Sequence, residues 1–236
     1  MALSAYTCTE HMNRYSYVQC KYQRGVKRLH KHLPDRKGDW IMELSRFLML
    51  LLLSGFYLTY AIKMLMLRNR GIKANLLGKG DKPEKAKLVE LLLNLSATLS
   101  TIIQFATVLF TWPTSIPALY VIGLVLAATG LSFFAVSVIT MRDNWRAGFD
   151  ENQKTNLVTH GIYTISRNPA FVGFGLMYIG CAMVFPFLLN IAAAAASLIL
   201  FHVQIKSEEK YLVKTFGKEY EAYKARVFRY LGRKLA

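Results

Sequence analysis

Long apolar blocks constrain the fold of this chain more than any other feature of its sequence. They cover Glu43–Leu67, Leu88–Phe110, Ile116–Met141, Ala170–Phe185 and Phe187–Ile205. The first three reach the length of about 20 residues that a spanning helix needs, whereas the last two are shorter and predict a tight helical hairpin around Pro186. We therefore expect an all-α, polytopic membrane protein with about five transmembrane helices, rather than a soluble domain.

A further amphipathic stretch covers about Ser207–Tyr230. Its larger apolar side chains recur every three or four residues, at Leu212, Phe216, Tyr220, Tyr223 and Val227. This spacing predicts a C-terminal helix that lies along the membrane interface. The alternative is a charged lid that only solubilises the end of the chain.

The net charge of +16 lies in the polar segments and predicts how the chain crosses the membrane. Lys and Arg number 7 in Arg68–Lys87, 4 in Met141–Asn168 and 9 in Lys206–Ala236, with none in Thr111–Pro117. The predicted helices put the three basic segments on one side, which the positive-inside rule makes cytoplasmic. Anionic membrane lipids are a sufficient partner for this charge, and we expect no nucleic acid, because no recognition motif accompanies it.

The 8 Lys and Arg before Trp40 break this rule, because the same topology puts them on the opposite side. Three explanations stay open: the first helix does not fully span, the segment lies outside despite its charge, or the natural chain starts at Met42. A metal site is not expected in this segment. Its candidate ligands, which fit no zinc spacing, are Cys8, His11, Cys20 and His30.

Polar residues flank the predicted hairpin on both sides. The stretch Leu157–Gly173 leads into it, and Glu208–Glu209 follows it. A hairpin returns the chain to the membrane edge from which it started, and charged groups beside lipid are costly, so this arrangement indicates a site. Because proline is favoured at the first helical position, Pro169 makes Asn168 the expected N-cap, with Arg167 facing the same spot.

Each of these residues also has a plain structural explanation. Arg167 could reach the headgroups from a capped helix end, His160 could be solvated, and a carboxylate of Glu208 or Glu209 could simply pair with Arg167. A ligand role is equally open, since a helix N-terminus favours an anion and a carboxylate could hold a cation or hydroxyls. Gln204 lies one turn before Glu208 on the same helical face. Taken alone, these residues predict a polar site at the cytoplasmic membrane edge.

Two longer motifs resemble a known enzyme family. The sequence LVTHGIYTISRNPAFVG at 157–173 resembles the LVxxGxYxxxRHPxYxG motif of the isoprenylcysteine carboxyl methyltransferases and related phospholipid methyltransferases. The sequence EEKYLVKTFGKEYEAYKARVFRY at 208–230 resembles their EExxLxxxFGxxYxxYxxRVxR tail. The match covers roughly Phe133–Arg233 and has two departures, since Asn168 replaces the family His and Phe171 replaces the Tyr.

The resemblance implies an all-helical membrane enzyme that uses S-adenosylmethionine, held between the hairpin and the C-terminal helix. By motif position, it assigns the cofactor-binding residues His160, Gly161, Tyr163, Arg167, Asn168, Pro169, Glu208, Glu209 and Tyr220. Arg167 and Glu208 are the candidate catalytic residues. The same motifs imply that Tyr220, Tyr223 and Arg226 close the pocket.

The sequence thus divides into a basic polar N-terminal segment (1–41), N-terminal membrane helices (42–132) and a methyltransferase-like membrane core with the C-terminal helix (133–236). The predicted function is methylation of an isoprenylcysteine-like carboxyl, or another polar group, on a lipophilic or lipidated substrate. Arg167, Arg142 or Arg146 could orient an acceptor carboxylate. Alternatives are phospholipid amine N-methylation, a sterol-reductase-like enzyme with a nicotinamide cofactor, and a non-enzymatic membrane binding protein. The expected location is the inner or plasma membrane.

Overall fold

The chain divides into two compact units, Met1–Leu44 and Ser45–Ala236. A computed structural model describes residues 36–152 and 155–234. Of the first unit it describes the start of helix α2, whose full bounds are Arg36–Asn69. This helix begins upstream of the expected start at Glu43. The cysteines and histidines considered as metal ligands above lie outside the described residues.

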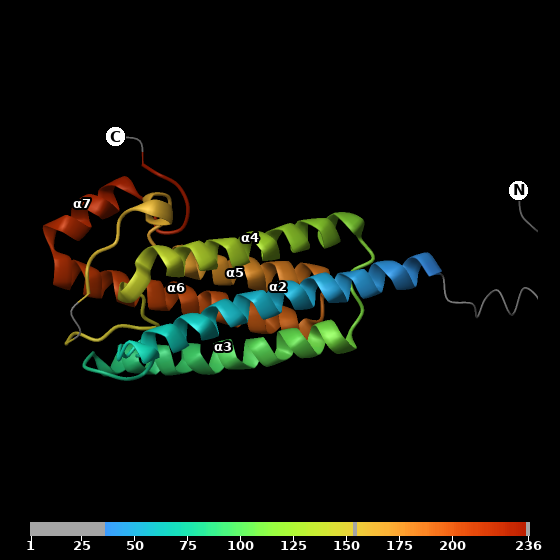
Figure 1. Ribbon diagram of the computed structural model, residues 1–236, viewed down its shortest axis with the longest axis horizontal. Coiled ribbons are helices and arrows are strands. Elements are labelled where there is room, and N and C mark those ends of the chain that lie inside the picture. The colour runs from blue at the N-terminus through green and yellow to red at the C-terminus, as the bar shows by residue number, and fades with distance from the viewer. Residues whose placement is uncertain (1–35, 153–154, 235–236) are drawn as a thin grey trace, which may run out of the picture. The chain divides into compact units, whose positions relative to one another are not determined.

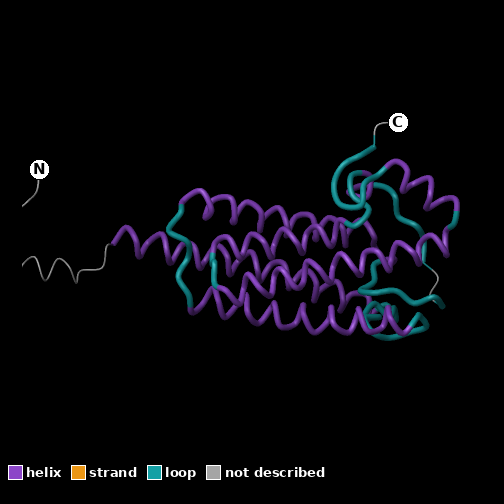
Figure 2. Tube along the Cα trace, turned by 180° about the vertical axis from the view of Figure 1, so that it is seen from behind, coloured by secondary structure: helices purple, strands orange, loops and turns teal. Residues whose placement is uncertain are grey.

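The second unit is built from helices and loops (Figure 1). After α2 come α3 (Glu84–Phe110), α4 (Pro117–Met141), η1 (Arg142–Asn144), η2 (Gly161–Thr164), α5 (Pro169–Val184), α6 (Leu188–Phe216) and α7 (Lys218–Arg226), where η marks a 3-10 helix. Figure 2 shows no strand in the described part of the chain. The all-α prediction is confirmed.

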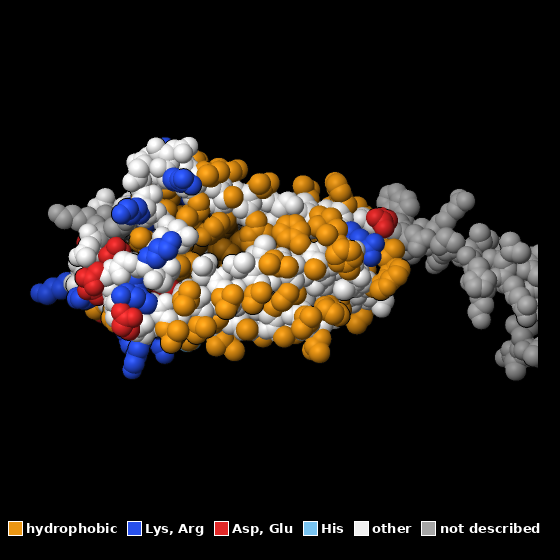
Figure 3. All heavy atoms as spheres, turned by 90° about the horizontal axis from the view of Figure 1, so that it is seen from below, with side chains coloured by type: hydrophobic (Ala, Val, Ile, Leu, Met, Phe, Trp, Pro, Cys, Tyr) orange, Lys and Arg blue, Asp and Glu red, His pale blue; other side chains and the backbone are white. Residues whose placement is uncertain are grey.

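Four stretches are long and apolar enough to cross a membrane: Met42–Asn69, Glu84–Phe110, Pro117–Asn144 and Leu188–Phe216. Helix α5 is apolar as well, but its 16 residues extend only about 24 Å. Figure 3 shows hydrophobic side chains over the helical surface, with charged side chains gathered toward the end that carries the loops. Outward-facing side chains such as Phe47 and Ile199 are more than half exposed, at 63% and 65%. An apolar surface this large identifies an integral membrane protein.

The predicted hairpin is asymmetric. Helix α5 is short, but α6 does not end near Ile205, because it continues without a break to Phe216. The second arm therefore carries Glu208 and Glu209 on a continuous helix. Their directions are fixed by the helix rather than by a loop.

The prediction of one continuous helix over Ser207–Tyr230 is wrong. Gly217 interrupts it with backbone angles of φ 52° and ψ −123°, which glycine adopts without the clash that a Cβ would cause. Residues before Gly217 belong to α6, and those after it form the short helix α7. The interruption lets α7 leave the line of α6 and fold beside η2 (Figure 1).

Helices α4 and α5 pack with their backbones almost in contact. A Cβ added to Gly130 on α4 would lie 2.7 Å from the carbonyl oxygen of Gly173 on α5, and the reverse addition would lie 2.8 Å from that of Gly130. Small residues at such a crossing let helices approach closely in lipid, where apolar burial gives little drive for association.

The loops gather at one end of the second unit (Figures 1 and 2). Residues 70–83, the segment from η1 to η2, and the chain after α6 all lie there. The short connections 111–116 and 185–187 lie at the other end. The segments that carry most of the basic residues are thus on one side, as the charge distribution predicted.

An aromatic cluster joins three helices below this loop-rich end. The ring of Phe56 on α2 stacks on Phe134 of α4 at 4.7 Å between centroids, and Phe174 of α5 meets both edge-on at 4.8 and 5.0 Å. Tyr60 and Trp145 extend the cluster with an edge-on pair at 5.6 Å. These rings form one rigid apolar wall beside the cavity described next.

Candidate functional site

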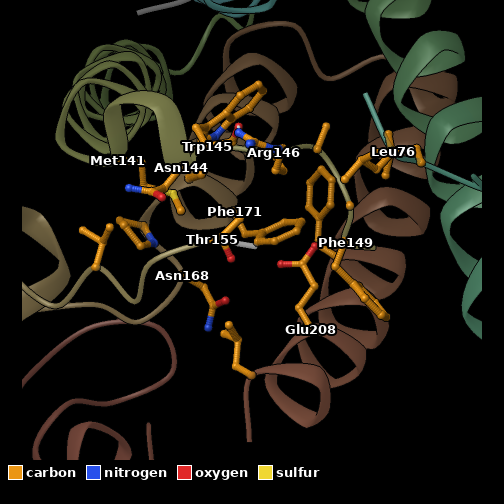
Figure 4. Close-up of a pocket in the computed structure, with 18 of the residues that line it drawn as sticks. Leu76, Met141, Asn144, Trp145, Arg146, Phe149, Thr155, Asn168, Phe171 and Glu208 are labelled. Carbon is orange, nitrogen blue, oxygen red and sulfur yellow. The ribbon is translucent and has the colours of Figure 1, made fainter. Parts of the chain in front are cut away.

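A cavity of about 330 Å³ lies at the loop-rich end and extends between the helices. Its polar lining comprises Asn94, Thr98, Thr101, Asn144, Arg146, Asp150, Thr155, Asn156, Arg167, Asn168 and Glu208. Figure 4 shows Asn168, Phe171 and Glu208 around one open space. The cavity joins side chains from both halves of the sequence, because Asn94 and Thr98 come from α3 and Glu208 from α6.

The remaining lining is mostly apolar and aromatic. It includes Leu93, Ala97, Phe134, Phe171, Phe174, Phe201, Leu212 and Phe216. Phe171 and Phe174 both pack on Phe201 across α5 and α6, with centroids 5.6 Å apart in each pair. A mostly apolar cavity with a few convergent polar groups is typical of a small-molecule site.

Glu209 is the centre of a buried ionic cluster just behind the cavity wall. Its Oε1 lies 2.9 Å from Nη2 of Arg167, and both side chains are 7% exposed. Its Oε2 accepts hydrogen bonds from Nε and Nη2 of Arg229 at 3.0 and 2.8 Å. These bonds raise the pKa of Arg229. The sequence left open whether Arg167 pairs with a following carboxylate, and the structure shows that it pairs with Glu209.

Asn168 stands directly before α5, where the sequence placed it, but its side chain does not cap the helix. Instead its Nδ2 donates to Oε1 of Glu209 at 3.2 Å and to the carbonyl oxygen of Arg229 at 3.1 Å. Asn168 is thus the N-cap residue of α5, as predicted, but its side chain makes no capping bond and its amide donates to the Glu209 carboxylate instead. Through its bond to Arg229, Asn168 connects the start of α5 to the loop that follows α7.

Glu208 differs sharply from its neighbour. It lines the cavity, and its Oε1 accepts a hydrogen bond from Nε2 of Gln204 at 2.9 Å. The two residues lie one turn apart on the same face of α6, as the sequence spacing predicted. No ion pair to Glu208 forms among the described residues.

Three tyrosines line the cavity on the side of η2 and α7. Tyr163, Tyr220 and Tyr223 line it and form a small core with Val227. The Tyr223 hydroxyl donates to the carbonyl oxygen of Tyr163 at 2.7 Å, and the Tyr163 hydroxyl lies 2.9 Å from Oγ of Ser137. Burial raises the pKa of all three phenols, which therefore stay protonated at neutral pH.

The cavity brings together six of the nine residues assigned to the cofactor: Tyr163, Arg167, Asn168, Pro169, Glu208 and Tyr220. Glu209 is not a lining residue, but it forms an ion pair with Arg167, which lines the cavity. His160 and Gly161 are exposed at the start of η2 and are not among the lining residues. Arg226, expected to close the pocket, is also exposed, and its Nε donates to the carbonyl oxygen of Ala222 at 3.3 Å.

Sequence reasoning missed Arg229 and the buried pair of Lys82 and Glu90. Arg229 lies beyond α7; it aligns with the last arginine of the family tail motif, but no role was assigned to it. Lys82 and Glu90 looked like ordinary loop and helix-end charges, yet their side chains are fully buried and 2.6 Å apart. Of the two loop arginines considered for an acceptor, Arg146 lines the cavity and Arg142 is exposed.

Comparison with known proteins gives sequence matches that include much of the cavity-lining part of the chain. The family model described as phospholipid methyltransferase matches residues 118–219. A probable protein-S-isoprenylcysteine O-methyltransferase of Oryza sativa subsp. indica is 31% identical over 114 residues, covering 45% of this chain and 57% of the relative. The protein-S-isoprenylcysteine O-methyltransferase of Schizosaccharomyces pombe is 38% identical over 79 residues, covering 32% and 33%.

The protein of the same name from Homo sapiens is 30% identical over 158 residues, which cover 62% of this chain and 55% of the relative. The chain therefore spans about half the length of the curated relatives it matches, and less for the yeast protein. The matched family segment runs from α4 to the start of α7 and carries most of the polar cavity wall.

Proposed function

We propose that the protein is an integral membrane methyltransferase that uses S-adenosylmethionine, because its residues 118–219 match the phospholipid methyltransferase family model. The acceptor is a polar group, first of all an isoprenylcysteine-like carboxyl, on a lipophilic or lipidated molecule. The observation that carries the proposal is one cavity with charged walls near Arg167 and Glu208 and apolar walls near Phe171 and Phe201.

The lining suits S-adenosylmethionine by its donors and acceptors. That molecule carries a sulfonium cation, an ammonium group and a carboxylate, so it needs both signs of charge around it. Glu208 supplies an acceptor, and Arg167 supplies a donor. Nε of Arg167 and the hydroxyl of Tyr220 are buried without a hydrogen-bond partner in the described part of the chain. A ligand that accepts hydrogen bonds here would satisfy both atoms.

When bound, S-adenosylmethionine supplies an activated methyl group that an acceptor takes by in-line displacement at carbon. The residues of this chain contribute orientation and the exclusion of water. Protonated Tyr220 and Tyr163 can donate hydrogen bonds but cannot serve as general bases at neutral pH. Phe171, Phe174 and Phe201 exclude water from the cavity's apolar wall.

Arg146 supports a carboxylate acceptor. It lines the cavity while its Nη1 donates to the carbonyl oxygens of Asp143 and Trp145 at 2.6 and 2.8 Å. These bonds hold the guanidinium in the loop above the cavity, where its planar fork can orient a carboxylate. Amine methylation is the second candidate, because it would need a base and Glu208 is a carboxylate on the cavity wall.

We further propose that the cavity faces the cytoplasm. The support is the charge distribution, since the segments rich in Lys and Arg share the loop-rich end. An accessibility experiment tests this orientation directly. A single cysteine at exposed His160, in a background without native cysteines, should react with a membrane-impermeant maleimide in inverted vesicles and stay unmodified in right-side-out cells.

The activity is tested with the full chain in lipid nanodiscs, labelled S-adenosylmethionine and a total lipid extract. Mass spectrometry then identifies which molecules gained a methyl group. We expect a lipophilic product that carries a methyl ester, whereas an N-methylated phospholipid would support the second candidate. If no molecule gains label and calorimetry detects no binding of S-adenosylmethionine, the proposed function is wrong.

A further inference from the structure

A buried chain of polar side chains runs from the α2–α3 loop to the cavity. It begins at Lys82, whose Nζ lies 2.6 Å from Oε2 of Glu90 and donates to the carbonyl oxygen of Leu76 at 3.0 Å. Nε2 of Gln204 then lies 3.1 Å from Oε1 of Glu90 and 2.9 Å from Oε1 of Glu208. The sequence Lys82, Glu90, Gln204, Glu208 thus links α3 to the carboxylate on the cavity wall.

The two carboxylates on either side of Gln204 determine the orientation of its amide. An ionised carboxylate accepts hydrogen bonds and donates none, so the amide nitrogen of Gln204, rather than its oxygen, must point toward Glu90 and Glu208. Lys82 neutralises Glu90 at a site where neither side chain is exposed. Because Lys82 compensates the charge of Glu90, Gln204 bridges Glu208 to a carboxylate that is already paired. The Nε2 donor of Gln204 also bonds Glu208 and so fixes the direction of its carboxylate.

Glu90 also holds a loop that forms the cavity wall. Its Oε1 accepts from the backbone nitrogen of Phe149 at 3.4 Å, and its Oε2 accepts from that of Gly78 at 2.8 Å. Nζ of Lys82 lies 4.8 Å from the centre of the Phe149 ring, a cation–π contact. Phe149 and Glu208 both line the cavity, so one buried ion pair fixes two parts of its wall.

We propose that Lys82, Glu90 and Gln204 are positioning residues that hold the Glu208 carboxylate in its ligand-binding direction. Lys82 and Glu90 lie outside the family-matched segment, so the helices before it would contribute to the site rather than only to its membrane anchor. This inference rests on the proposed function, because it assigns the role of Glu208 to binding S-adenosylmethionine.

The test is the affinity of the full chain for S-adenosylmethionine in nanodiscs, measured by calorimetry together with the unfolding temperature. Gln204→Leu keeps the ion pair but removes the donor to Glu208, and should weaken binding about tenfold or more. The matched control is Ser197→Ala on the same helix. Ser197 is fully buried and joins α6 to α3 through Oγ contacts of 2.8 and 2.9 Å with Ser96 and Ser100.

A merely structural role predicts that both variants lose stability and keep the parent's affinity. The positioning role predicts that Gln204→Leu loses affinity while Ser197→Ala keeps it within about twofold. The double variant Lys82→Met/Glu90→Gln is a second test that leaves no unpaired buried charge, and it should also bind more weakly than the parent. Parent affinity in Gln204→Leu, or in the double variant if Gln204→Leu does not fold, overturns the inference alone. Absence of binding by the parent overturns the proposed function and this inference with it.

Discussion

Glu208 and Glu209 are neighbours in the chain, yet they occupy two different regions of the molecule. Glu209 accepts hydrogen bonds or an ion pair from Arg167, Asn168 and Arg229, which saturate its two oxygens. Glu208 faces the cavity and accepts one hydrogen bond from Gln204. Successive residues point about 100° apart on a helix, so one carboxylate can serve the fold while the next serves a ligand.

The contrast between Glu208 and Glu209 shows which partners a buried carboxylate needs in a structural role and in a ligand-binding role. A structural carboxylate must have its lone pairs satisfied by protein, because an unpaired buried charge is costly. A ligand-binding carboxylate needs enough protein contact to fix its direction and must keep acceptor capacity free. The Glu209 cluster joins α5, α6 and the C-terminal loop, whereas Glu208 lines the cavity and accepts one hydrogen bond from Gln204, as the proposed ligand-binding role requires.

The largest effect should come from Glu209→Ala. This change leaves the 7% exposed Arg167 without its counter-charge and should lower the stability of the loop-rich end by about 3–5 kcal/mol. We expect a lower unfolding temperature in detergent and loss of cofactor binding together. An unfolding temperature equal to the parent's would show that the cluster is not structural.

Glu208→Gln should separate binding from stability. The substitution keeps the shape of the side chain but removes its charge, so we expect binding of S-adenosylmethionine to weaken at least about tenfold. The unfolding temperature should stay near that of the parent, because no ion pair is broken. Calorimetry and thermal unfolding of the same samples check this contrast, and a fall in stability with unchanged affinity would reverse the roles assigned to the two glutamates.

A tyrosine pair sharpens the comparison on the α7 side. Tyr220→Phe removes a buried hydroxyl that has no partner within the described residues, so it should lower ligand affinity several-fold without a loss of stability. Tyr223→Phe instead breaks the 2.7 Å bond to the Tyr163 carbonyl oxygen and should cost about 1 kcal/mol of stability. Equal effects of the two changes on affinity would contradict the assignment.

Phe171→Tyr should give the smallest effect. Phe171 lines the cavity and packs on Phe201, and the substitution adds one hydroxyl at a position where the family motif has tyrosine. We expect unchanged stability and a change of less than about threefold in affinity for S-adenosylmethionine. A change confined to the Michaelis constant of the lipophilic acceptor would assign this wall to the acceptor.

Much of the architecture was predictable because long apolar blocks have few possible structures in lipid. The helical hairpin that returns Glu208–Glu209 to the level of Arg167 follows from block length alone. The end of α6 did not follow, because the amphipathic spacing of Leu212, Phe216 and Tyr220 runs through Gly217 without a change of period. Only the backbone angles at Gly217 separate α6 from α7.

The candidate site was predictable in its residues but not in their division of labour. The motifs pointed to Arg167, Glu208 and Glu209, and the structure shows which glutamate Arg167 pairs with. Glu90 could not be recognised as a residue that supports the cavity wall, because its partners Lys82 and Gln204 are 8 and 114 residues away in sequence. Burial of a paired charge depends on tertiary packing that local patterns do not record.

The most direct test of the central claim is photochemical cross-linking of labelled S-adenosylmethionine to the full chain in nanodiscs, followed by peptide mapping. We predict label on peptides that contain Asn144–Asp150, Arg167–Phe171 or Glu208–Tyr223, and its loss when excess unlabelled compound is added. Label that resists this competition, or that maps only to the opposite end of the bundle around Thr111–Ile116, would contradict the account.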